Sequence, residues 1–118
     1  HKIKGIVIEC LGAYNLPFEA FDMITFVEFA ISNFIPVVLT TRYPISHANV
    51  EIYQTSSKAL KTGAIVAGKM TSSTALVKFM WVLAQIEHIK KEDRISEARK
   101  LLNETEYVGE FDIKLSID

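Results

Sequence analysis

The chain has 118 residues, of which 49% are hydrophobic and 23% charged. This length suits one domain with a core of its own, and the composition is that of an ordinary globular protein. The formal net charge of −1 provides no positive field for nucleic acid or an anionic membrane, so we expect neither as a partner. A single cysteine excludes a disulfide framework and a cluster of thiolate metal ligands.

The sequence predicts neither a membrane span nor a secretory signal. The longest apolar stretch, residues 18–38, is interrupted by acidic and amide side chains. The initial His1 and Lys2 are not followed by the apolar run and small-residue cleavage site of a signal peptide. We therefore expect a cytoplasmic protein. Because the chain begins without methionine, we also expect it to be a fragment of a longer one.

The first predicted strand is the run from Gly5 to Leu11, whose β-branched residues are typical of a buried parallel strand. A loop containing Asn15 then leads to Pro17, a favourable first residue of a helix. The helix predicted over residues 17–33 is apolar on most faces, so we expect more than one side to be covered, either inside a larger protein or at a subunit contact. Asn33 is predicted to close this helix in a left-handed conformation.

The second predicted strand runs from Ile35 to Thr41 and ends in a polar loop. Two strands joined by one helical crossover lie parallel, so their following loops leave the same edge of the sheet. In open α/β sheets, ligands bind at the carboxyl ends of the strands. We therefore predict that Asn15 lies beside the 42–49 loop, and that Asn15, Arg42 and His47 form a ligand site. Simple surface placement remains the alternative for His47.

The rest of the chain predicts one strand and several helices. A short helix from Ser56 is closed by Gly63, and residues 64–67 form the third strand. Thr71 is predicted to cap a long helix. Asp93 is predicted to cap another that ends at residues 103–104. The predicted inner faces of these two helices comprise Ala75, Leu76, Phe79, Met80, Leu83 and Ile86 in the first, and Ile95, Ala98, Leu101 and Leu102 in the second.

Residues 110–118 alternate between apolar and polar side chains, as an edge strand exposed on one face does. The order of elements predicts a single α/β domain over residues 1–118. It has three layers, α/β/α, around a small parallel sheet of the Rossmann or flavodoxin-like kind. Three parallel strands and one doubtful edge strand are few for so much apolar helix. The fold therefore also indicates a piece of a larger protein.

The sequence holds no complete catalytic constellation. It lacks the GxSxG, GxGxxG, P-loop and HExxH motifs, and its three histidines have no metal-ligand spacing, so we expect no metal and no catalytic residue in this chain. Glu9 is interpreted as lying at a strand edge or facing a missing domain, and Cys10 as an inert core thiol. The serines and threonines of residues 71–74 are interpreted as a cap rather than an anion cradle, and His88 as a solvated residue.

Three collinear segments, GIVIECLGAYNLP, IPVVLTTRYP and NVEIYQTSSKALKTGAIVAGKMTSSTALVKFMWVLAQ, resemble the C-terminal domain of cytoplasmic L-asparaginases. The D subunit of the tRNA-dependent amidotransferase belongs to the same superfamily. The G-x-G-N-x-P loop of the family is matched by residues 12–17, and its T-Q/R-x strand end by residues 41–43. Its A-x-x-K helix is matched by Ala75 and Lys78, and its R-G-E ending by residues 108–110.

This resemblance implies a two-domain amidohydrolase with its nucleophilic threonine in an N-terminal domain that this chain does not contain. The C-terminal domain of one subunit would complete the pocket of its neighbour in a homodimer, with Asn15 reaching the shared site. No cofactor is implied. The family also has one more β-α unit before Gly5, so this chain would lack that unit and be inactive alone.

The implied reaction is hydrolysis of asparagine to aspartate and ammonia. One alternative is a glutaminase-type subunit for tRNA-dependent transamidation. Another is a non-enzymatic α/β domain that binds a small ligand or partner through Asn15 and the 42–49 loop. Departures from the family pattern at Tyr14, Ser46, Ser56 and Lys69 leave a diverged or inactive relative open.

Overall fold

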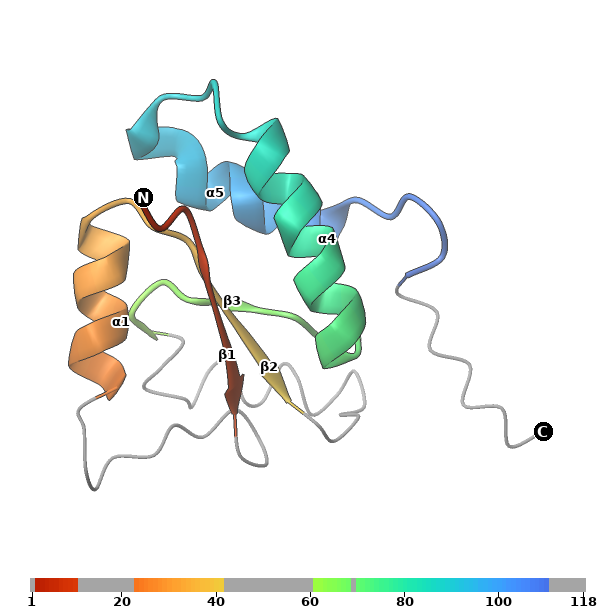
Figure 1. The fold of residues 1–118 in the computed structure, drawn as a ribbon, viewed down its shortest axis with the longest axis horizontal. Coiled ribbons are helices and arrows are strands. Elements are labelled where there is room, and N and C mark those ends of the chain that lie inside the picture. Colours follow the sequence, from red (N-terminus) through yellow and green to blue (C-terminus); the bar gives the residue numbers. More distant parts are fainter. Residues whose placement is uncertain (1, 11–22, 42–60, 69, 111–118) are drawn as a thin grey trace.

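The computed structural model describes residues 2–10, 23–41, 61–68 and 70–110 (Figure 1). Three strands form a parallel sheet in the order β1-β2-β3. They are β1 (Ile6–Cys10), β2 (Val37–Thr41) and β3 (Ile65–Val66). Helix α1 (Met23–Ser32) covers one face of the sheet, and α4 (Ser72–Gln85) with α5 (Arg94–Arg99) covers the other. The predicted three-layer α/β fold with a small parallel sheet is confirmed.

The central strand β2 is buried along its whole length. Its side chains alternate between two cores: Val37 and Leu39 pack with Val27 and Ala30 of α1, whereas Val38 packs on the side of α4 and α5. A strand covered on both faces needs apolar residues at consecutive positions. That requirement explains the continuous apolar run in the sequence.

Gly5 allows α4 to approach the start of β1 closely. A Cβ atom at this position would lie 2.7 Å from Cζ of Phe79 and 2.8 Å from Cδ1 of Leu83. Phe79 is itself buried in the core between the sheet and α4. The glycine is therefore required by packing.

Helix α4 begins as predicted, but its buried face differs from the predicted one. The hydroxyl of Thr71 accepts a hydrogen bond from the backbone N–H of Thr74 at 3.2 Å, which confirms the cap. Leu76 and Met80, predicted to face inward, are 47% and 64% exposed. The predicted stripe was wider than the part of the helix that the sheet and α5 cover. The residues of α4 that are buried are Ala75, Lys78, Phe79 and Val82.

The end of α1 corrects a second prediction. The left-handed residue is Phe34, with φ of 61°, and not Asn33. The backbone N–H of Ile35 donates to the carbonyl of Ala30 at 2.9 Å, and that of Phe34 to Ile31 at 2.9 Å. These two bonds are the Schellman pattern, in which the residue after the C-cap adopts the left-handed conformation.

Asn33 instead donates from Nδ2 to the carbonyl of Phe29 at 2.8 Å. The side chain of Phe29 is 68% exposed. The prediction that a larger protein or a subunit contact covers a second side of this helix stays a prediction, because the structure holds this chain alone. The part of the predicted helix before Met23 lies outside the described residues.

The last helical region is less regular than predicted. A 3-10 turn (Lys91–Asp93) precedes α5, and a π turn (Lys100–Glu104) follows it, so the helix ends where predicted. The side chain of Asp93 makes no capping hydrogen bond, because the residue is already part of the preceding turn. Ala98 and Leu102 are buried as predicted.

Two further predictions concern residues near the undescribed segments. Gly63 has φ of 100° after the helical Lys61, which confirms the predicted closing glycine. Most of the short helix predicted from Ser56, and the strand predicted over residues 110–118, lie outside the described residues. In the part of the chain that the structure describes, the helices are too short or too polar to cross a membrane.

Candidate functional site

The carboxyl ends of β1 and β2 lie side by side. In the parallel register, Glu9 pairs with Thr40 and Cys10 with Thr41, so both strands end at one edge of the sheet (Figure 1). This confirms the prediction that the two strands are parallel and end together. The proposed ligand residues Asn15, Arg42 and His47 follow these strand ends in the sequence and lie outside the described residues. Their grouping stays a prediction.

The amino end of α4 reaches the same edge. The hydroxyl of Ser72 donates to the carbonyl of Thr41 at 3.4 Å, and that of Thr71 donates to Thr74 at 2.9 Å. The hydroxyls of Thr71 and Thr74 are therefore engaged in the cap, as expected for a capping sequence. The positive end of the helix dipole lies beside the end of β2.

Thr40 has an unusual environment at this edge. Its hydroxyl oxygen is fully buried and, among the described residues, is the one buried side-chain oxygen or nitrogen without a hydrogen-bond partner. A buried hydroxyl left in this way costs about 1–3 kcal/mol. The end of β2, after which the segment with Arg42 and His47 begins in the sequence, therefore contains a destabilising polar group.

The last two residues of β1 have the roles expected of them. Glu9 is exposed on an edge strand of the described sheet, in agreement with its interpretation as an edge residue. Cys10 is buried, and its Sγ lies 3.8 Å from the carbonyl of Ile8. Burial raises the pKa of the Cys10 thiol to about 12, so it is protonated at neutral pH and a poor nucleophile.

The structure adds a buried ion pair that the sequence did not reveal. Lys78 was predicted to lie off the inner face of α4, yet its side chain is only 7% exposed. Its Nζ lies 2.8 Å from Oε2 of Glu110 and donates to the carbonyl of Thr105 at 2.6 Å. The pair joins the middle of α4 to the segment that follows the π turn.

The Glu110 carboxylate also organises its own segment. It accepts hydrogen bonds from the backbone N–H groups of Tyr107 and Val108, each at 2.8 Å from Oε1. Burial by itself would raise the pKa of Glu110, but the Lys78 ammonium and these N–H groups lower it to about 2. We call residues 105–110, closed onto α4 in this way, the clasp.

A sequence signal for this pair did exist. Lys78 stands in the A-x-x-K segment and Glu110 in the R-G-E-like ending, both part of the family resemblance. The two segments are distant in the sequence, and a lysine on an amphipathic helix is usually solvated. Their contact therefore became visible only in the structure.

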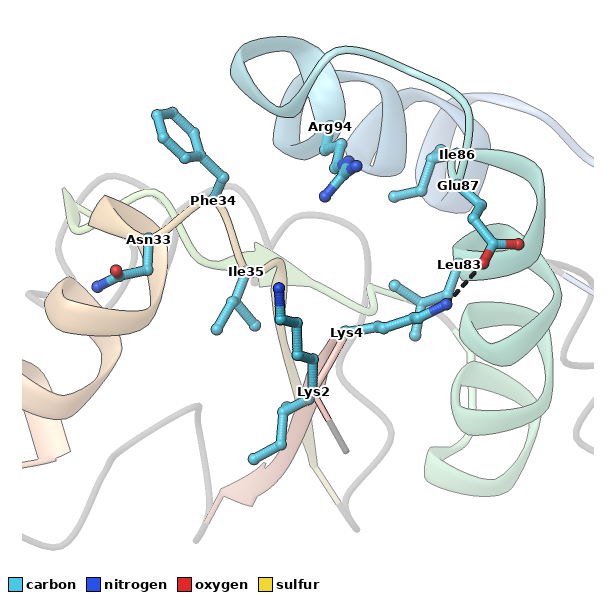
Figure 2. Close-up of a pocket in the computed structure, with 10 residues that line it drawn as sticks. Lys2, Lys4, Asn33, Phe34, Ile35, Leu83, Ile86, Glu87 and Arg94 are labelled. Atoms are coloured by element: carbon cyan, nitrogen blue, oxygen red, sulfur yellow. Dashed lines mark hydrogen bonds and ion pairs between the residues drawn. The ribbon is translucent and has the colours of Figure 1, made fainter.

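A pocket of about 660 Å³ lies at the opposite, amino edge of the sheet (Figure 2). Lys4 reaches across it to Glu87, with 2.6 Å between Nζ and Oε1, and both side chains are more than half exposed. The hydrogen bond from Lys4 lowers the pKa of Glu87. Arg94 donates from Nε to the carbonyl of Ile89 at 3.2 Å. These solvated charges do not form a catalytic arrangement.

The described residues offer no other chemistry. His88 is exposed in the turn after α4, as interpreted from the sequence. No group of three or more histidine, cysteine or acidic side chains within residues 2–10, 23–41, 61–68 and 70–110 is placed to hold a metal ion.

Residues 1–95 match the model of the glutaminase/asparaginase C-terminal domain family. Among similar proteins, the D subunit of the glutamyl-tRNA(Gln) amidotransferase of Methanobrevibacter smithii is 37% identical over 97% of this chain and 24% of its own length. The corresponding D subunit of Pyrococcus abyssi is 36% identical over 92% of this chain and 22% of its own length. An L-asparaginase of Thermococcus kodakarensis is 31% identical over 79% of this chain and 28% of its own length.

The parallel α/β domain and the family match together identify the class. The chain belongs to the glutaminase/asparaginase C-terminal domain family. This confirms the resemblance drawn from the sequence motifs. The chain spans about a quarter of the length of the relatives it matches.

Proposed function

We propose that this chain forms part of an amidohydrolase that cleaves the side-chain amide of asparagine, and that it supplies substrate-binding residues rather than the nucleophile. The observation that carries the proposal is the register of β1 and β2. Because of this register, the segment with Asn15 and the segment with Arg42 and His47 both follow strand ends at the carboxyl edge of the sheet. Ligands of parallel sheets bind at this edge. Membership of the family supports an amide substrate.

Two properties of the described residues favour an auxiliary rather than a nucleophilic role. Cys10, the single cysteine of the chain, is buried at the carboxyl end of β1 and is protonated. The hydroxyls of Thr71 and Thr74 at the start of α4 are engaged in its cap. The attacking hydroxyl would then come from another part of the longer protein, and the pocket would be completed between two subunits.

The test is ammonia release by the full-length protein, measured with asparagine and with glutamine. Asn15→Ala and His47→Ala are each expected to lower kcat/KM for the preferred amide at least about tenfold. This is the change that the loss of one or two hydrogen bonds to the substrate would cause. His88→Ala serves as the matched control for His47, because His88 is exposed in the turn after α4. Unchanged kcat/KM in both loop variants would refute the assigned site, and no ammonia from either amide would refute the reaction.

A second substrate, glutamine, is favoured by one observation. The two relatives named as amidotransferase D subunits match more of this chain, and at higher identity, than the L-asparaginase does. A glutamine-specific protein would release ammonia from glutamine alone in the same assay. The ratio of the two kcat/KM values decides between the substrates.

A further inference from the structure

The outer face of α4 and the clasp carry most of the exposed apolar surface of the described residues. Of the large hydrophobic residues exposed in this part of the chain, Ile3 and Phe29 lie elsewhere. The others form what we call the α4 patch: Leu76, Val77, Met80 and Trp81 of α4 with Tyr107 and Val108 of the clasp. From their exposed fractions, they present on the order of 700 Å² of surface, whereas the largest apolar patch of a typical monomer is about 300–600 Å².

The exposed face of α4 has no charge. Lys78 is the only charged residue of this helix, and its ammonium is buried against Glu110. Besides the patch, the exposed residues of α4 are Ser73, Ala84 and Gln85. The solvated face of a helix normally carries charged side chains. The buried centre of a protein interface lacks them and is rich in aromatic residues and methionine, so the α4 patch has the composition of an interface centre.

The patch is held in one shape. A groove of about 670 Å³ separates Val77 and Trp81 from the clasp. The Trp81 and Tyr107 rings meet edge to face, with centroids 4.8 Å apart. The buried pair of Lys78 and Glu110 fixes the clasp to α4. A partner would therefore not have to order this surface on binding.

The order of residues along α4 is matched to an antiparallel copy of the same helix. The large exposed residues stand at positions 76, 77, 80 and 81, symmetrically about the midpoint of Ser72–Gln85. The small Ser73 and Ala84 lie on the same side of the helix, about three turns apart, at equal distances from this midpoint. Two copies that meet at their midpoints bring the large residues together and place Ser73 of each opposite Ala84 of the other. Such a face is self-complementary, as a two-fold contact requires, and the opposed helix dipoles attract.

The area of the patch suits such a contact. A standard interface buries about 800 Å² of each partner, and the α4 patch alone supplies on the order of 700 Å². We propose that two copies of this chain associate through the α4 patch, with their α4 helices antiparallel across a two-fold axis. The inference rests on this surface and not on the proposed reaction.

A cysteine crosslink tests both the contact and its orientation. The double variant Ser73→Cys/Ala84→Cys is made in the full-length protein and oxidised with copper phenanthroline. The two positions are about 16 Å apart along one helix, too far for a disulfide within one chain. Two-fold pairing places each opposite the other, so we expect a covalent dimer on a non-reducing gel. Each single variant should stay unlinked, because its two copies of the cysteine are also about 16 Å apart. Cys10 does not compete, because it is buried and protonated.

A charge in the patch tests the surface itself. Val77→Asp, added to the double cysteine variant, would bury an unpaired carboxylate and should slow crosslinking at least about tenfold. The matched control is Phe29→Asp on α1, because Phe29 and Val77 are both 68% exposed. It should leave the rate unchanged, and circular dichroism should be the same for both variants.

Three results would overturn the proposal. The absence of a covalent dimer in the double cysteine variant would mean that another part of the longer protein covers the patch. A ladder of larger products would show a head-to-tail contact instead of a closed two-fold pair. Equal crosslinking rates in the Val77→Asp and Phe29→Asp variants would show that the contact does not use the α4 patch.

Discussion

At the scale of single residues, Gly5 allows α4 to pack closely against the start of β1. Gly5→Ala places a methyl group 2.7 Å from Cζ of the buried Phe79 ring, so the ring or the backbone has to shift. Overpacking of this kind costs about 1–3 kcal/mol. We expect the free energy of unfolding, measured by urea denaturation, to fall by this amount. Lys4→Ala at the neighbouring exposed position is the control, and equal stability of the two variants would contradict the assigned contact.

The buried pair of Lys78 and Glu110 gives a second prediction. Glu110→Gln leaves a buried ammonium without its counter-charge, and we expect the free energy of unfolding to fall by about 3 kcal/mol. The double variant Lys78→Met/Glu110→Leu removes both charges and should recover most of this loss. Thermal and urea unfolding of the three proteins measure it. A double variant no more stable than Glu110→Gln would show that the charges are not the cause.

The same carboxyl predicts a dependence of stability on pH. The folded state holds the pKa of Glu110 at about 2, below the ordinary value of 4.5. A lowered pKa means that the ionised group contributes stability above pH 4.5, and that this contribution is lost as the pH falls toward 2. We expect Glu110→Gln to flatten the free energy of unfolding between these pH values. The exposed Glu106→Gln should follow the parent curve; if it flattened the curve equally, the effect would not belong to the Glu110 carboxyl.

At the scale of elements, α4 depends on the residue that caps it. Thr71→Ala removes the hydroxyl that accepts the backbone N–H of Thr74, and caps of this type are worth about 1 kcal/mol. We expect that loss of unfolding free energy in urea. Ser73→Ala, at an exposed position inside the first turn, is the matched control. Equal losses in the two variants would mean that α4 does not rely on the cap.

The sequence predicted the elements better than their faces and ends. The strands could be predicted because a buried parallel strand needs a run of apolar residues. Thr71 could be predicted as a cap because few residue types cap a helix. The inner face of α4 was misjudged at Leu76 and Met80, since apolar periodicity does not reveal how much of a helix its neighbours cover. The end of α1 was misplaced by one residue, since hydrogen bonds decide whether Asn33 or Phe34 becomes left-handed.

The candidate site was predictable only as an edge of the sheet. Parallel pairing follows from the order strand, helix, strand, so the common origin of the two loops could be inferred and is confirmed. Lys78 was missed because its partner lies in the clasp, and pairing between distant segments is not encoded in local periodicity. The placement of Asn15, Arg42 and His47 within their loops depends on segments outside the described residues and is still a prediction.

At the scale of the whole molecule, the described residues form two cores that have no member in common. Val27 belongs to the core with α1, and Val82 to the core with α4. Substitutions at separate sites without shared partners add within about 0.5 kcal/mol. We therefore expect Val27→Ala and Val82→Ala, combined, to lower the unfolding free energy by the sum of the single losses. Phe79→Leu combined with Val82→Ala lies within one core, so its loss of unfolding free energy should differ from the sum of the single losses. A large difference for Val27→Ala with Val82→Ala would show that the two cores are not energetically separate.

The position of β2 between these two cores has a consequence for how such a domain changes over time. A new side chain in α1 needs compensation only on its own side of the sheet, and one in α4 only on the other. The five residues of β2 must satisfy both neighbourhoods at once. Selection can therefore revise either helix layer while the other stays as it is, and the central strand is the part with the least freedom to drift.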